Sequence, residues 1–100
     1  MSSACESGNF EIVKYLVKHG ADVNKVHRWD METPLFSACR SGNLNIVKYL
    51  EEHGADVNKE NNEGETPLIY ACSNGNFEIV KHLVEKHGAD VNKENDIPIS

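Results

Sequence analysis

Three cysteines are the residues of this chain best suited to covalent or metal chemistry, since a thiolate is both a nucleophile and a metal ligand. Cys5, Cys39 and Cys72 each follow an alanine and stand three residues before a glycine. This common register places each thiol in a separate structural unit, and it brings no histidine or aspartate beside them. We therefore expect the cysteines to pack as small apolar side chains, with no disulfide, metal site or catalytic role.

The five histidines could also bind a metal or carry protons, but their positions favour packing. Three of them recur 34 residues apart: His19, His53 and His87. Each ends an amphipathic segment, where a partial positive charge suits the C-terminus of a helix. His82 replaces a tyrosine of the other copies, which predicts a packing or surface position, and His27 alone is unique. We expect no metal, no cofactor and no catalytic residue among them.

Trp29 is the only tryptophan and stands in a polar segment between Arg28 and Asp30. An exposed aromatic ring beside an arginine is typical of an anchor residue at a protein interface. The alternative is that the ring folds back and fills the loop that carries it. The sequence leaves both interpretations open.

A repeated string determines how these residues are positioned. His-Gly-Ala-Asp-Val-Asn-Lys occurs at 19–25, 53–59 and 87–93. A fixed period of roughly 20–50 residues indicates one supersecondary unit that is copied and stacked. The glycine of each copy follows a segment with helical apolar spacing, as expected of a left-handed residue just past a helix end.

Apolar residues at spacings of three and four predict three matching amphipathic helices. Their expected ranges are 10–19, 44–53 and 77–87. The residues expected to cap them through a side-chain oxygen are Asn9, Asn43 and Asn76. Glu51 interrupts the apolar stripe where the other copies have valine, and we expect this side chain to be partly exposed.

Shorter helices are predicted to begin at Thr33-Pro34 and Thr66-Pro67. Threonine suits the cap, and proline suits the first helical position, where its missing N–H is no loss. Gly42 and Gly75 are expected to end these helices as left-handed caps. In the loops before them, Met31 stands where the second loop has Gly64, which predicts a different turn at the first tip.

The motifs Thr-Pro-Leu, Ala-Cys-x-x-Gly-Asn, Ile-Val-Lys-x-Leu and Gly-Ala-Asp-Val-Asn, in this order at a stride near 33, resemble the ankyrin repeat. The resemblance implies an all-α solenoid of stacked helix-turn-helix units joined by hairpin-like loops. One departure concerns the histidine that follows Pro-Leu in the family, which is Phe36 in one copy and Ile69 in the other. The hydrogen bond from that histidine to the capping threonine should therefore be absent.

The expected repeats divide a single domain over residues 1–100. A partial first repeat covers about 1–27, the second about 28–60 and the third about 61–94, and a fourth begins at 95–100. Because neither end carries a complete capping repeat, we expect marginal stability and a tendency for ends to stack on one another. The tail at 97–99 could instead cover its own end of the stack.

The resemblance also implies a protein-binding module, whose partner contacts loop tips and the concave face of the short helices. Carried over by position, that surface comprises Trp29, Asp30, Glu32, Arg40, Ser41, Asn62, Glu63, Glu65, Ser73 and Asn74. The alternative is a slice of a longer array used for spacing or self-assembly. An enzyme is not expected, because the repeated histidines and cysteines are explained by packing.

The asparagines that end the repeated string are Asn24, Asn58 and Asn92. The residues themselves suggest that each side chain ties down loop backbone by hydrogen bonding. The resemblance suggests a second interpretation, because asparagines at this place in ankyrin repeats can be substrates of an asparaginyl hydroxylase.

Composition limits the classes of partner that we expect. A net charge of −6, from 16 acidic and 10 basic residues, argues against nucleic acid or an anionic membrane and favours a protein with a basic patch. No stretch approaches the ~18 apolar residues of a membrane span. The N-terminus lacks the basic start and apolar run of a secretory signal, and an odd number of cysteines suits a reducing compartment. We expect a cytoplasmic or nuclear protein that is not secreted.

Overall fold

The computed structural model describes residues 1–87, and over this range the chain forms six α-helices and no strand. Three are short: α1 (Ser2–Ser7), α3 (Pro34–Ser41) and α5 (Pro67–Ser73). Three are longer: α2 (Phe10–Lys18), α4 (Leu44–Glu52) and α6 (Phe77–His87). Residues from 88 onward lie outside the described range, and with them the rest of the third copy of the repeated string, Asn92, the tail at 97–99 and the expected fourth repeat.

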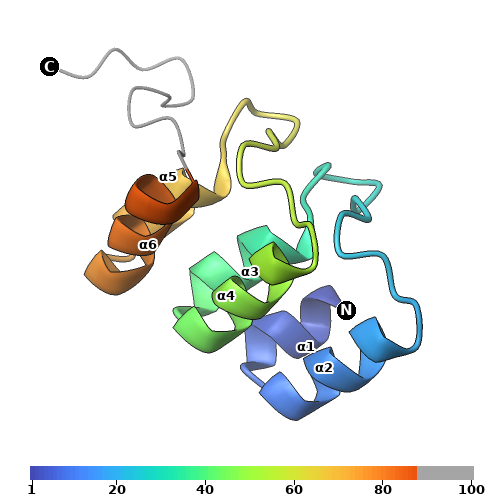
Figure 1. Ribbon diagram of the computed structural model, residues 1–100. Coiled ribbons are helices and arrows are strands. Elements are labelled where there is room, and N and C mark those ends of the chain that lie inside the picture. Colours follow the sequence, from blue (N-terminus) through green and yellow to red (C-terminus); the bar gives the residue numbers. More distant parts are fainter. Residues whose placement is uncertain (88–100) are drawn as a thin grey trace, which may run out of the picture.

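The helices form two layers, as Figure 1 shows. In one layer α1 packs on α3 and α3 on α5; in the other α2 packs on α4 and α4 on α6. Each short helix also packs against the long helix that follows it, so that three helix pairs stack in chain order. The loops that join the pairs lie on one side of this stack (Figure 1). The architecture is the all-α solenoid predicted from the motifs.

Side-chain caps fix the starts of two long helices, as predicted. Asn9 accepts a hydrogen bond from the backbone N–H of Ile12 at 3.2 Å, and Asn43 accepts one from Ile46 at 3.1 Å. The first two long helices each end one residue earlier than predicted. The reason is that His19 and His53, with φ near −100°, already stand at the C-cap.

The caps of the short helices differ from the prediction in two ways. Thr33 and Thr66 do occupy the N-cap positions, and a proline follows each, but neither hydroxyl caps the helix. Both Oγ1 atoms are buried without a hydrogen-bond partner among the described residues, as expected where the histidine of the family is replaced. At the other end, Gly42 caps α3 with φ 78°, whereas α5 ends at Asn74 in a right-handed conformation and Gly75 follows with φ 69°.

The core lies between the two layers and is continuous through all three pairs. Helix α3 is the most enclosed element, because α1 covers it on one side and α5 on the other. Every residue from Pro34 to Cys39 is buried, and Leu35 and Phe36 are completely so. Burying side chains of this size stabilises the fold by about 1.5–3 kcal/mol each. Val13 of α2 is also completely buried.

Asparagine side chains join successive pairs through the loops. The amide nitrogen of Asn24 donates to the carbonyl of Gly54 at 2.9 Å, and its Oδ1 accepts from the N–H of Asp56 at 2.8 Å. This is the backbone-tying role expected of Asn24, although the backbone it holds belongs to the next pair. At the helix ends, the side-chain amides of Asn43 and Asn74 likewise donate to backbone carbonyl groups of the preceding pair.

The two hairpin-like loops take different turns, as predicted, although each places a left-handed residue before a glutamate. Met31 has φ 63° and Gly64 has φ 76°. The N–H of Met31 donates to the carbonyl of His27, four residues back, at 2.8 Å, whereas the N–H of Gly64 donates to the carbonyl of Asn61, three residues back, at 3.1 Å. The extra residue of the first loop is accommodated earlier, because the bond that closes it runs from the N–H of His27 to the carbonyl of Glu32, at 2.8 Å. The equivalent bond in the second loop joins Asn61 to Glu65 at 2.9 Å.

Candidate partner-binding surface

Trp29 is the most exposed large apolar residue described, with 75% of its surface accessible. The ring therefore does not fold back to fill its loop. Its backbone is nevertheless held, because its N–H donates to Nδ1 of His27 at 3.3 Å and its carbonyl accepts from Asn62 at 3.0 Å. The Arg28 guanidinium carbon lies 5.9 Å from the ring centroid, at the outer limit of a cation–π contact. An exposed ring thus stands on a backbone whose position is fixed.

The two hairpin-like loops are joined at their tips. Besides its side-chain bond to Trp29, Asn62 donates its backbone N–H to the carbonyl of Asp30 at 2.9 Å. Within the first loop, Oδ1 of Asp30 accepts from the N–H of Glu32 at 2.9 Å. Because neighbouring loops brace each other, Trp29, Asp30, Asn62 and the exposed Glu63 form one continuous surface.

Glu32 does not lie on that surface, which corrects its placement among the exposed residues. The residue is 7% exposed, and its carboxylate is the centre of a buried polar network. One oxygen accepts from Arg40 at 3.0 Å, and the other accepts from Asn61 at 2.9 Å and from the Tyr70 hydroxyl at 2.5 Å. These bonds tie the first hairpin-like loop to α3, the second loop and α5. Glu32 therefore holds together the elements that carry the exposed surface.

Tyr70 and Arg40 line the outer side of this network. Burial raises the pKa of the Tyr70 phenol, and the hydrogen bond and charge of Glu32 raise it further, so the phenol keeps its proton and donates it. The guanidinium of Arg40 lies over the Tyr70 ring, 5.2 Å from the centroid. Its other neighbour is Glu6, whose Oε1 is 3.7 Å from the guanidinium. Glu65, half-buried, joins the same group by accepting from the amide nitrogen of Asn61 at 3.1 Å.

The remaining predicted residues stand on the exposed C-terminal ends of α3 and α5. Ser41 is exposed, but its hydroxyl donates to the carbonyl of Cys5 at 3.0 Å and so joins two helix pairs. Asn74 does the same one pair later, through a bond of 2.9 Å to the carbonyl of Arg40. Ser73 is exposed beside it. Two of these residues therefore have a structural role as well as an exposed surface.

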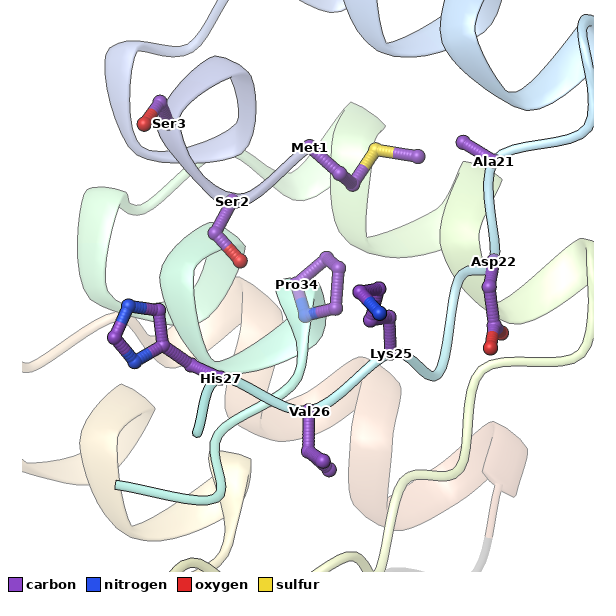
Figure 2. A pocket seen from close by; sticks show the side chains of 9 residues that line it. All are labelled: Met1, Ser2, Ser3, Ala21, Asp22, Lys25, Val26, His27 and Pro34. Atoms are coloured by element: carbon purple, nitrogen blue, oxygen red, sulfur yellow. The ribbon is translucent and has the colours of Figure 1, made fainter. Parts of the chain in front are cut away.

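Two adjoining cavities open near these residues. The more polar one, of about 220 Å³, includes Asp30, Glu32 and Arg40 in its lining, together with Glu6 of α1. The other, of about 420 Å³, is drawn in Figure 2 between the start of α1 and the loop that follows α2. Met1, Lys25 and Pro34 border it, and none of the predicted partner residues does. The polar cavity is thus the one that coincides with the predicted surface.

The cysteines are placed as small packing residues in two cases out of three. Cys5 and Cys39 are completely buried, and burial raises the pKa of Cys5 to about 11. Cys72 is exposed, contrary to the prediction, because no following pair of the described stack covers the outer side of α5. Within residues 1–87, no three histidine, cysteine, aspartate or glutamate side chains converge as metal ligands would.

A pair that the sequence interpretation missed lies between α4 and α6. The side chain of Glu51 is 1% exposed instead of partly exposed, and its carboxylate contacts Nε2 of His82, whose side chain is 14% exposed. Both residues were recognised as departures from the repeat pattern. The contact between them could have been predicted, because one departure is acidic and the other is basic, and both fall on the long helices of successive pairs.

Comparison with known families decides the classification. A family model described as ankyrin repeats (3 copies) matches residues 1–95, nearly the whole chain. The chain belongs to the ankyrin-repeat family. Ankyrin repeats are generally protein–protein interaction modules and are typically not enzymes. No protein with a curated description matches this ankyrin chain. Among the described residues, no helix of this ankyrin repeat protein is long and apolar enough to cross a bilayer.

Proposed function

We propose that this ankyrin-repeat chain binds a protein partner through its hairpin-like loop tips and the exposed ends of α3 and α5. The observation that carries the proposal is Trp29, whose ring is 75% exposed while hydrogen bonds hold its backbone in place. A large ring presented on a fixed backbone loses little conformational freedom on binding, which is the property of an interface anchor.

The charge around Trp29 supports a partner with a basic patch. Asp30 and Glu63 stand on the joined loop tips, and Glu6 and Glu65 border them. Two cations lie among them: Arg40, which is engaged with Glu32 and Glu6, and Arg28, whose guanidinium carbon lies 5.9 Å from the Trp29 ring centroid. Carboxylates in excess on one face attract a cationic segment and orient it during the encounter. The proposed role is binding without catalysis. The proposed location is the cytoplasm or nucleus, and the proposed repeat boundaries are those predicted from the sequence.

Selection from a random peptide library displayed on phage tests the proposal. We expect the selected peptides to be enriched in lysine and arginine. Trp29→Ala should weaken their binding by about thirtyfold or more, as hot-spot truncations of about 2 kcal/mol do, with the thermal midpoint almost unchanged.

The matched control is Tyr15→Ala, which removes another exposed aromatic ring, from α2, outside the proposed surface. It should leave peptide binding intact. Equal losses in the two variants, or selected peptides without basic residues, would contradict the proposal. A large fall in the thermal midpoint of Trp29→Ala would show that the ring is structural.

A second candidate function is stacking of the chain on further repeats, including a second copy of itself. One observation favours it. Phe77 of α6 is 68% exposed, whereas its equivalent Phe10 packs edge-on against Tyr49 of the next pair, with ring centroids 5.5 Å apart. Tyr15, the equivalent of Tyr49 in the first pair, is also exposed. The two ends therefore present the two halves of a contact that the chain makes internally.

A further inference from the structure

The joint between the second and third helix pairs contains a buried acid–base pair. Glu51 of α4 and His82 of α6 face each other there, with side chains 1% and 14% exposed. A single charge at a position so removed from water is strongly unfavourable, so a partner that keeps the site neutral matters for packing. The packing of α6 on α4 thus includes a proton-binding site.

The first joint shows what this position contains when it is apolar. Counting back one repeat, Glu51 corresponds to Val17 and His82 corresponds to Tyr49. Both of those residues are partly buried against the core. The chain therefore builds the same joint twice, once from valine and tyrosine and once from glutamate and histidine. Packing alone does not require the charged version.

The groups around the pair come from several elements. Glu52 follows on α4, and α3 contributes the buried thiol of Cys39, whose pKa is raised first by burial and then by the charge of Glu51. A cavity of about 140 Å³ beside His82 is lined by charged side chains of both long helices: Lys48, Glu78, Lys81 and Glu85. Helix α5 carries no charged residue, and α2, on the other side of α4, holds Lys14 in an ion pair with Glu11.

We propose that Glu51 and His82 form a proton-dependent catch that holds the third repeat on the second. With one proton shared between them, the pair has no net charge, whether that proton lies on the imidazole or on the carboxylate. When the proton leaves to solvent at higher pH, a net negative charge remains in the buried joint. The joint then weakens, and α6 separates from α4 more readily. This inference is independent of the proposed partner binding.

The direction of the pH effect follows from burial. Burial raises the pKa of Glu51 to about 7, and the negative charge of Glu52 adds to this. In the unfolded chain the last proton of the two residues belongs to histidine, with a pKa near ~6.5. The folded pair binds that proton more tightly, so its contribution to stability is complete below that value. It is lost as pH rises through the folded pKa, at or above neutrality.

The first measurement is an NMR titration of the histidine rings in the full chain. The reference is the chain unfolded in urea, in which histidine has its ordinary pKa near ~6.5. We expect the His82–Glu51 pair of the folded chain to release its last proton at a higher pH than this reference. If the His82 ring releases its proton at or below the reference value, the pair does not retain a proton and the proposal is wrong.

The second measurement compares hydrogen exchange of the α6 amides at pH 6.0 and 8.5, corrected for the intrinsic exchange rate. In the unmodified chain the protection of α6 should fall about threefold, which is the effect of a folded pKa of about 7 against ~6.5 in the unfolded chain. The control is the double variant Glu51→Val with His82→Tyr, which copies the first joint into the second. Its protection should not depend on pH, and a matching fall in this variant would overturn the proposal.

Single variants complete the comparison. His82→Tyr alone removes the imidazole that contacts the buried Glu51 carboxylate, and should lower the protection of α6 at pH 8.5 below that of the unmodified chain. Adding Glu51→Val should restore it. If His82→Tyr alone is as protected as the double variant, Glu51 is not held by His82 and no catch exists.

Discussion

Two threonine hydroxyls lie buried at the starts of α3 and α5, and neither has a hydrogen-bond partner among residues 1–87. A buried hydroxyl without a partner loses its bonds to water and gains none in return. The side chains that follow the proline and leucine after them, Phe36 and Ile69, are apolar and cannot supply a donor or acceptor. These threonines therefore contribute their shape to the helix starts, and their oxygens cost stability.

Replacing Thr66 by valine should stabilise the protein. The variant keeps the branched shape and removes the unsatisfied oxygen, for an expected gain of about 1 kcal/mol in the free energy of unfolding. Urea unfolding followed by circular dichroism measures it. The control is Ser41→Ala, which removes a hydroxyl that does have a partner and should destabilise the chain. A valine variant less stable than the parent would show that the hydroxyl is satisfied in solution.

At the scale of single residues, the sequence predicted positions in the helices well but hydrogen-bond partners poorly. It placed threonine at the two caps, and it indicated that the hydrogen bond from the family's histidine is missing. It did not place Glu32 inside the protein, because the polar atoms that make burial tolerable come from Arg40, Asn61 and Tyr70, far along the chain. A short stretch of sequence cannot show that these groups converge on one carboxylate.

At the scale of the elements, the hydrogen bonds between repeats that a single substitution can best remove lie in the loops and not in the helices. Asn24 is the clearest case, since both polar atoms of its amide bond the backbone of the following loop. Each exposed hydrogen bond of this kind contributes about 0.5–1.5 kcal/mol. The loops thus act as ties between repeats as well as connections within the chain.

Two substitutions of Asn24 should distinguish the contributions of its two hydrogen bonds to stability. Asn24→Ala removes both and should lower the free energy of unfolding by about 1–2 kcal/mol. Asn24→Asp keeps the acceptor for the N–H of Asp56 but loses the donor to Gly54, and should show an intermediate loss. Guanidinium unfolding curves of the three proteins give the values. An unchanged midpoint in the alanine variant would mean that water replaces the tie without cost.

Helix positions could be predicted almost to the residue, because apolar spacing and capping residues are local signals. The turn before Glu32 could not, since the steric cost of a left-handed methionine argues against the conformation that Met31 adopts. The loop-to-loop and loop-to-helix bonds around it, including those of Asn62, hold the backbone there. Tertiary contacts have overridden a local preference.

At the scale of the whole stack, residues 1–87 form two unlike end faces, and this predicts weak self-association. Phe77 is exposed at one end and Tyr15 at the other, in the positions of the internal Phe10–Tyr49 contact. We expect sedimentation at millimolar concentration to show dimers or longer stacks that dissociate on dilution. Phe77→Lys should abolish them.

The control for this variant is Glu78→Lys, which makes a larger change toward positive charge, two units instead of one, at the neighbouring exposed position of α6. It should leave the association unchanged. A strictly monomeric parent chain across the whole concentration range would show that the ends do not recognise each other. Equal effects of the two lysine variants would point to net charge as the cause.

The pair at the second joint also bears on how such a chain can lengthen. A copy of the first repeat inserted at the first joint would again place a valine opposite a tyrosine, as Val17 and Tyr49 are placed now. A copy of the second repeat inserted at the second joint would place Glu51 opposite a tyrosine, while the copied glutamate would face His82. Duplication of the first repeat therefore extends the array with matched positions, whereas duplication of the second repeat creates one joint in which a glutamate lacks its histidine.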